Sequence, residues 1–165
     1  MSSELAFRAQ LILSEQRELY DYWRRCFRSG AIPYRNDIDP IAIPHLLPGV
    51  SLLDAEDGPE AIRYRLAGTR VCQIYGDELT GRGVFDLDLE KKGDYWRAVY
   101  RQVLMDRLPM QGVVRGPVAH RDHLLLFWLR LPLRNEAGKV SRILGYDATL
   151  PSSLALTAFP EAAEG

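Results

Sequence analysis

The stretch that decides the fold reads His123-Leu124-Leu125-Leu126-Phe127-Trp128-Leu129-Arg130-Leu131-Pro132-Leu133. Every second position from Leu125 to Leu133 is apolar, and Leu124, Leu126 and Trp128 make the other face nearly apolar as well. An antiparallel strand with one face in water alternates apolar and polar residues instead. We therefore predict a central strand here that other parts of the protein cover on both faces.

The segments around this strand predict an α+β domain with a five-stranded antiparallel sheet. Ile62, Tyr64 and Leu66 alternate with two arginines, which is the period of a half-buried strand. A short helix is expected from Thr69 to about Tyr75, and Gly76 suits its C-terminal end. The remaining elements are strands over 49–55, 61–67, 110–120 and 140–150 and a longer helix over 95–107. We expect the helical block 69–107 to cover one face, over the apolar sides of 62–66 and 125–133.

Residues 4–29 predict one long amphipathic helix, which we expect to lie outside the core. Its apolar positions follow a heptad spacing with one polar member, Gln16. Such a helix either packs on its own domain or contacts a second copy of the chain. Both arrangements can also hold together, at different ends of the same helix. The residues predicted for a dimer contact are Leu5, Ala9, Ile12, Leu19 and Trp23. The connector over 33–49 carries four prolines, which allow at most short helical turns.

Composition limits the class of protein. The chain has 165 residues, the size of one ordinary domain, and 21 basic against 22 acidic side chains give a net charge of −1. This balance argues against nucleic acid as a partner, because nucleic-acid binders carry a basic excess. No apolar run reaches the length of a membrane span. The two cysteines, 46 positions apart, match no disulfide framework, so we expect a cytoplasmic protein.

No set of residues predicts catalysis or a metal site. His120 and His123 flank Arg121-Asp122, and we interpret them as a solvated hairpin tip. Asp54, Asp86, Asp88 and Asp147 are scattered and predict no acid–base pair. Apolar and aromatic residues on several elements predict either a filled core or the lining of a small-molecule pocket. The candidates for that pocket are Tyr64, Leu66, Phe85, Val99, Val103, Phe127 and Tyr146.

The stretches Arg63-Tyr64-Arg65-Leu66-Ala67-Gly68-Thr69 and Tyr75-Gly76-Asp77-Glu78-Leu79-Thr80-Gly81 resemble the PAS family. The match is to its single-domain bacterial branch, mostly alphaproteobacterial, and covers roughly residues 15–150. The segments Leu19-Tyr20-Asp21-Tyr22-Trp23, Arg35-Asn36-Asp37-Ile38-Asp39-Pro40 and Leu46-Leu47-Pro48 are similar to that branch too. The domain organisation that this implies is an N-terminal helix over 1–32, a PAS-like domain over 33–150 and a loose tail over 151–165.

The resemblance implies a stand-alone sensory or adaptor module in bacterial signal transduction, and not an enzyme. It implies protein–protein contact with a separate signalling protein, a homodimer, and a small ligand as an optional gate. Cys72 does not match the cysteine motif of the light-sensing members, and 94–107 holds no histidine for heme. We therefore expect neither a photoactive flavin nor heme, and the cofactor stays unknown. The alternatives are a small cone-shaped α+β pocket enzyme or ligand carrier, and an oligomerisation module built on the N-terminal helix.

Overall fold

The computed structural model describes residues 2–154, and its centre is one antiparallel sheet in the order β2-β1-β5-β4-β3. The predicted fold class is confirmed. The strand β4 lies between β3 and β5, as its two apolar faces predicted. The strands are β1 (Val50–Asp54), β2 (Arg63–Ala67), β3 (Met110–Arg115), β4 (Leu124–Arg134) and β5 (Val140–Pro151).

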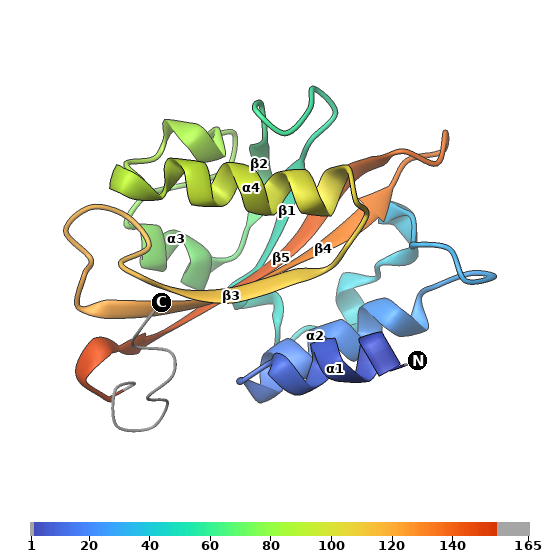
Figure 1. The fold of residues 1–165 in the computed structure, drawn as a ribbon, viewed down its shortest axis with the longest axis horizontal. Coiled ribbons are helices and arrows are strands. Elements are labelled where there is room, and N and C mark those ends of the chain that lie inside the picture. The colour runs from blue at the N-terminus through green and yellow to red at the C-terminus, as the bar shows by residue number, and fades with distance from the viewer. Residues whose placement is uncertain (1, 155–165) are drawn as a thin grey trace.

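Helices lie on both sides of this sheet. Figure 1 shows α3 (Thr69–Tyr75) and α4 (Gly93–Leu104) on one side, and α1 (Ser2–Gln10) and α2 (Ser14–Arg25) on the other. The proline-rich connector forms only short 3-10 turns, as predicted, and two more such turns lie between α3 and α4. The five turns are Arg35–Asp37, Pro40–Ala42, Leu47–Gly49, Val84–Asp86 and Glu90–Lys92.

Strand β4 separates two hydrophobic cores. Leu126 and Trp128 pack in the core beneath α3 and α4, whereas Leu129, Leu131 and Leu133 pack against the N-terminal helices. Our expectation that the 125–133 face lies under the helical block is therefore wrong. Both faces of the strand are apolar, so its sequence does not show which cover meets which face. The pairing with β5 and the chain path decide it.

The expected continuous helix over 4–29 is also wrong, because the chain forms two helices with a break at 11–13. Leu13 is extended at φ −89° and ψ 140°, and its backbone N–H donates to the Gln16 side chain at 3.2 Å. Arg17 donates to the carbonyl of Leu11 at 2.7 Å. Arg8 on α1 pairs with Asp21 on α2 at 2.8 Å, so the two helices lie against each other. Gln16, the polar member of the heptad spacing, thus caps the first turn of the second helix.

The N-terminal helices lie on the other side of the sheet from the core under α3 and α4. They form the second hydrophobic core. Leu19 and Trp23 are buried there, and the Trp23 indole N–H donates to the Pro132 carbonyl at 2.9 Å. Leu5 and Ala9, in contrast, are exposed on α1. Only part of the predicted dimer contact is therefore exposed, because Leu19 and Trp23 are buried within their own chain.

Strand β2 contains an irregularity that reverses the side on which Leu66 lies. Leu52 pairs with Leu66 and Leu53 pairs with Tyr64, so the register shifts between these two pairs. A bulge inserts one extra residue into a strand, so the side chains beyond it change faces. Tyr64 is consequently buried under α3 and α4, while Leu66 is 54% exposed on the opposite face. Our prediction that Ile62, Tyr64 and Leu66 share one buried face is wrong at Leu66.

None of the helices among the described residues is both long enough and apolar enough to cross a membrane. The tail predicted over 151–165 begins at the last residue of β5, and most of it, 155–165, lies outside the described residues.

Candidate functional site

The predicted pocket residues fall on two sides of the sheet. Tyr64, Phe85, Val99 and Val103 lie in or against the core beneath α3 and α4. Leu66, Phe127 and Tyr146 lie on the opposite face, so our assignment of these three to the same cleft is wrong. Phe127 packs with Leu125, Ile12 and Leu13, and Tyr146 accepts a hydrogen bond from Arg70 at 3.1 Å. Side chains alternate between the two faces of the sheet along β4 and β5. The odd-numbered residues of β4 and their partners on β5 therefore point away from α4.

A buried ion pair occupies the interior, where the sequence predicts either a filled apolar core or the lining of a pocket. Arg130 on β4 is 1% exposed and Asp147 on β5 is fully buried. Two guanidinium nitrogens face the two carboxylate oxygens at 3.0 and 3.3 Å. The same guanidinium donates to the Leu129 carbonyl at 2.9 Å and to the Tyr100 hydroxyl at 3.2 Å. This bidentate arrangement is the geometry in which arginine holds a carboxylate most firmly.

The titration of this cluster depends on its burial. Burial raises the pKa of Asp147 above its usual value, and the neighbouring Arg130 offsets part of that shift. Burial by itself would lower the pKa of Arg130, but Asp147 and three buried tyrosines raise it well above its usual value. Burial also raises the pKa of Tyr64 and Tyr75 well above 10. At neutral pH the interior therefore holds one compensated ion pair among neutral phenols.

Aromatic rings close over this pair. The Trp96 ring on α4 lies 4.9 Å from the Trp128 ring, and the Arg130 guanidinium carbon lies 5.4 Å from the Trp96 ring. Tyr100 stacks on Trp96 with ring centroids 5.8 Å apart. Gly145 is needed at the base of the cluster, because a side-chain carbon there would lie 2.5 Å from the Ser51 hydroxyl oxygen. The space between α4 and the sheet is thus filled by side chains of this chain.

Our sequence analysis missed Arg130 and did not pair Asp147. The signal was present in the quoted stretch, where Arg130 is the one charge inside a run of apolar residues on a central strand. A buried charge needs a partner. The sequence does not name that partner, because Asp147 comes to lie beside Arg130 only through the β4–β5 register.

An apolar groove lies on the opposite side, against the connector. It has a volume of about 270 Å³ and continues the exposed surface of Leu66 and Leu47. Arg35 is its one charged lining residue. The apolar lining comes from the connector, the sheet and the end of β2: Ile38, Pro40, Ile43, Leu47, Val50, Leu52, Leu66, Ala67 and Leu144.

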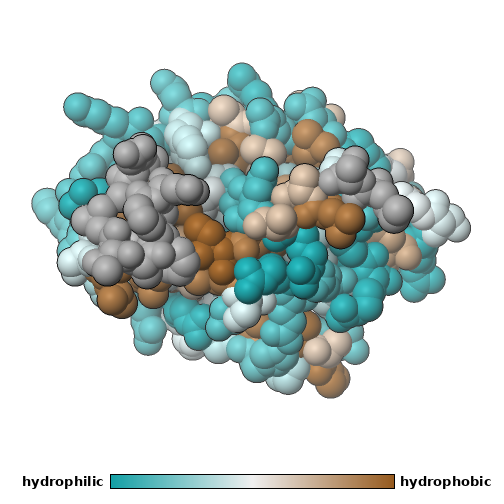
Figure 2. All heavy atoms as spheres, turned by 60° about the horizontal axis from the view of Figure 1, so that its bottom comes forward, coloured by the Kyte–Doolittle hydropathy of each residue, from teal (hydrophilic) through white to brown (hydrophobic). Residues whose placement is uncertain are grey.

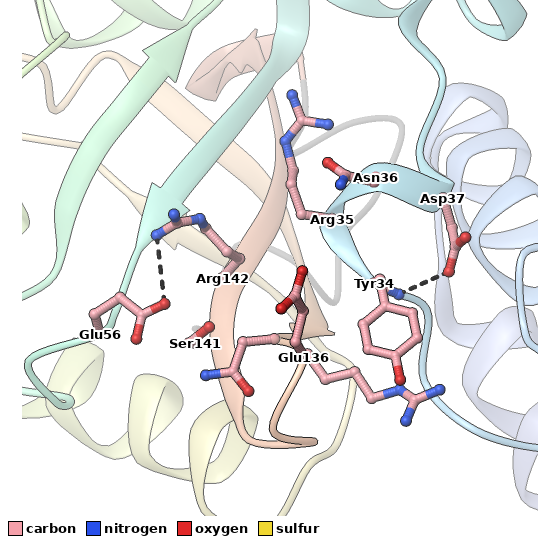
Figure 3. A pocket seen from close by; sticks show the side chains of 10 residues that line it. Tyr34, Arg35, Asn36, Asp37, Glu56, Glu136, Ser141 and Arg142 are labelled. Atoms are coloured by element: carbon pink, nitrogen blue, oxygen red, sulfur yellow. Dashed lines mark hydrogen bonds and ion pairs between the residues drawn. The ribbon is translucent and has the colours of Figure 1, made fainter.

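A larger polar cleft of about 470 Å³ adjoins this groove. The turn Arg35–Asp37 forms one wall, and the β4–β5 hairpin with Glu136 forms the other. Figure 3 shows the Glu136 carboxylate pointing into the space between Arg142 and Arg35. The full lining is Tyr34, Arg35, Asn36, Asp37, Glu56, Arg134, Asn135, Glu136, Ser141 and Arg142.

Within residues 2–154, no group of three or more His, Cys, Asp or Glu side chains is placed to hold a metal ion. Cys26 and Cys72 are both free thiols.

Comparison with known families identifies the fold. The family model described as PAS domain matches residues 13–147, which is most of the chain. The chain belongs to the PAS family. A search of the curated proteins found no match. The PAS assignment accounts for the order of elements, with α3 and α4 between the second and third strands, and it supports a sensory role in signal transduction.

Solved structures agree with this PAS fold. One is a light-oxygen-voltage domain studied with a flavin analogue, 17% identical, with a TM-score of 0.56 over 75% of this chain and 92% of that one. A light-oxygen-voltage protein of Rhodobacter sphaeroides is 17% identical, with a TM-score of 0.50 over 73% of this chain and 77% of that one. An RNA-binding light-oxygen-voltage receptor is 18% identical, with a TM-score of 0.56 over 82% of this chain and 39% of that one. At these identities the likeness shows the fold alone.

The side chains present do not fit the flavin that such domains suggest. A flavin ring between α4 and the sheet would have to displace Trp96, Trp128 or the Arg130–Asp147 pair, all of which are buried and in mutual contact.

Proposed function

We propose that this PAS domain is a sensory and adaptor module of bacterial signal transduction that binds a separate signalling protein and responds to a small ligand. The observation that carries the proposal is the apolar groove along the connector. Leu66 and Leu47 are 54% and 36% exposed, and Ile41 nearby is 85% exposed. Connected exposed apolar surface on a protein marks an interaction site. We place the module in the cytoplasm, consistent with its two free thiols.

The groove favours one kind of partner. Its walls accept apolar side chains, and its one charged group, the Arg35 guanidinium, stands at the rim without an ion-pair or hydrogen-bond partner among the described residues. A matching protein surface presents one or two apolar side chains beside an aspartate or glutamate. The apolar anchor supplies affinity, and the carboxylate opposite Arg35 supplies orientation and faster association.

Site-specific photocrosslinking tests this contact. A photoreactive benzoylphenylalanine replaces Leu66 in the full chain, in cells that naturally make the protein, and replaces Met105 as the control. Met105 is 67% exposed but does not line the groove. We expect a crosslinked product from the Leu66 position alone, joined to an apolar peptide that contains an acidic residue.

The variant Leu66→Glu should fold normally, since residue 66 is exposed, yet prevent that same partner from crosslinking to a probe at Leu47. Crosslinks only to a second copy of this chain, or equal yields from positions 66 and 105, would contradict the proposed partner contact.

A further inference from the structure

The polar cleft holds charges of both signs, and most of them already have partners. Asp37 pairs with Arg28 at 2.9 Å, and Arg142 pairs with Asp54 at 2.8 Å. Arg134 donates to the Ile32 carbonyl, and its guanidinium carbon lies 4.0 Å from the Tyr34 ring centroid. These residues build the walls and are held in place by contacts within the protein.

Three groups in the same cleft have no such partners among the described residues. The Arg35 guanidinium and the Glu136 carboxylate make no ion pair or side-chain hydrogen bond there. The Ser141 hydroxyl is fully buried, lines the cleft and has no hydrogen-bond partner. A buried hydroxyl without a partner costs free energy. Figure 3 places Ser141 and Glu136 on the hairpin side and Arg35 on the facing turn.

We propose that this cleft binds a small zwitterion of the α-amino-acid class, whose carboxylate pairs with Arg35 and whose ammonium pairs with Glu136. The proposal rests on the proposed function, because it names the site and class of the small ligand. It places that ligand outside the filled interior. A volume of about 470 Å³ lies within the range of small-molecule sites.

The charge balance requires both signs on the ligand. A purely anionic ligand would meet Glu136 and Glu56, and a purely cationic one would meet Arg35, Arg134 and Arg142. A like charge held close in such a site opposes binding. The ligand's two charges satisfy one unpaired group on each wall.

Arg35 connects the cleft with the apolar groove, because it lines both. A ligand carboxylate that binds Arg35 removes this cation from the partner's carboxylate. The ligand and an acidic partner therefore compete for one guanidinium, and by linkage each weakens the binding of the other.

Calorimetry on the full chain with each of the twenty standard L-amino acids tests the site. We expect at least one of them to bind, and its N-acetyl and amide derivatives, which each lack one charge, to bind about tenfold or more weakly. Glu136→Gln should abolish the discrimination against the N-acetyl derivative only. Arg35→Gln should abolish the discrimination against the amide only.

Matched controls are Glu90→Gln and Arg65→Gln, which change exposed charges outside the cleft and should leave affinity and both preferences unchanged. The site is overturned if no amino acid binds at millimolar concentration, or if Glu136→Gln retains its preference against the N-acetyl derivative. Failure here is distinguishable from failure of the partner contact, because Glu136 and Ser141 do not line the groove. Glu136→Gln should leave any crosslinking from position 66 unchanged, whether or not an amino acid binds the cleft.

Discussion

Arg130 carries a positive charge into the centre of the domain, and Asp147 balances it. Neither side chain has access to solvent, so the charge of each is stabilised in the folded state by the charge of the other. Replacing such a pair by apolar residues of similar volume is often neutral, whereas removing one partner is strongly unfavourable. The pair therefore indicates where the interior is most sensitive to a single change.

We expect Arg130→Met and Asp147→Leu each to lower the free energy of unfolding by about 3–5 kcal/mol, because each leaves the opposite buried charge uncompensated. The double variant Arg130→Met/Asp147→Leu should lose less than the sum of the two single effects. Urea unfolding of the four proteins measures the coupling. Additive losses would contradict the mutual dependence of the pair.

Phe127 and Leu66 lie on the same side of the sheet but differ in burial. Phe127 is 1% exposed beside Ile12 and Leu13, and Leu66 is half exposed at the groove. We expect Phe127→Ala to cost about 3–5 kcal/mol of unfolding free energy through the cavity it leaves. Leu66→Ala should cost less than about 1.5 kcal/mol, since little of its area is removed from water. Similar losses for the two variants in denaturant unfolding would contradict this assignment.

Tyr64 and Tyr75 predict a loss of stability in alkali. Their pKa values in the folded state lie well above 10, the ordinary value that applies when the chain unfolds. The folded chain therefore retains protons that the unfolded chain loses, so stability is full below about pH 10 and falls as pH rises above it. Urea unfolding between about pH 9 and 11 measures the decline. Tyr75→Phe should make it shallower, and an unchanged slope in that variant would contradict this cause.

At the scale of elements, two features hold the break between α1 and α2, a side-chain cap and the burial of Leu11. The Gln16 side chain accepts the Leu13 N–H at 3.2 Å, while Leu11 in the break is buried in the second core. The Arg8–Asp21 pair between the helices is about 35–44% exposed on its two side chains and is worth little on its own. The break is therefore held mainly by the burial of Leu11 and by the start of α2.

Gln16→Ala should lower the unfolding free energy by about 0.5–2 kcal/mol, the usual cost of losing a side-chain cap. Gln16 is 2% exposed, so Gln16→Met, which removes the acceptor but keeps most of the buried volume, serves as the matched control and should lose less stability than Gln16→Ala. Thermal and denaturant unfolding followed by circular dichroism measures both variants. Full stability of Gln16→Ala would show that burial of Leu11 alone maintains the break.

At the scale of the whole molecule, dimerisation stays a prediction. Fewer exposed residues support it than the heptad spacing suggested. Leu19 and Trp23 are buried within their own chain, and Leu5 with Ala9 on α1 remains available. Figure 2 shows hydrophobic residues grouped on a face that is otherwise mostly hydrophilic. A twofold contact through α1 would cover the exposed Leu5 of both copies.

We expect sedimentation at micromolar concentration to show a dimer that Leu5→Glu converts to a folded monomer. Leu5 is 65% exposed, so the change should leave the fold intact, and Met105→Glu at a similar exposure is the control. Deleting residues 1–14 is a poor test, because it also removes the buried Leu11. A monomeric parent protein, or a dimer that Leu5→Glu leaves unchanged, would contradict an α1 contact.

The sequence by itself determined the sheet, the helices between its second and third strands, and the family. The apolar stretch over 124–133 required a central strand, because only burial on both faces accounts for it. Short-range signals also placed α3, α4 and the β4–β5 hairpin, since glycine, proline and periodicity act within a few residues. The PAS stretches over 63–81 fall on β2, on α3 and on the segment directly after α3.

Only the tertiary structure decided which elements each face of the sheet contacts. The bulge in β2 places Leu66 on the opposite face of the sheet from Tyr64. The break at 11–13 makes two helices of a stretch whose apolar spacing predicts one. The Arg130–Asp147 pair required the register of two strands, and the polar cleft required the Arg35–Asp37 turn to meet a hairpin about 100 positions later. Such long-range contacts depend on the chain path as a whole, whereas local patterns specify only the element in which they occur.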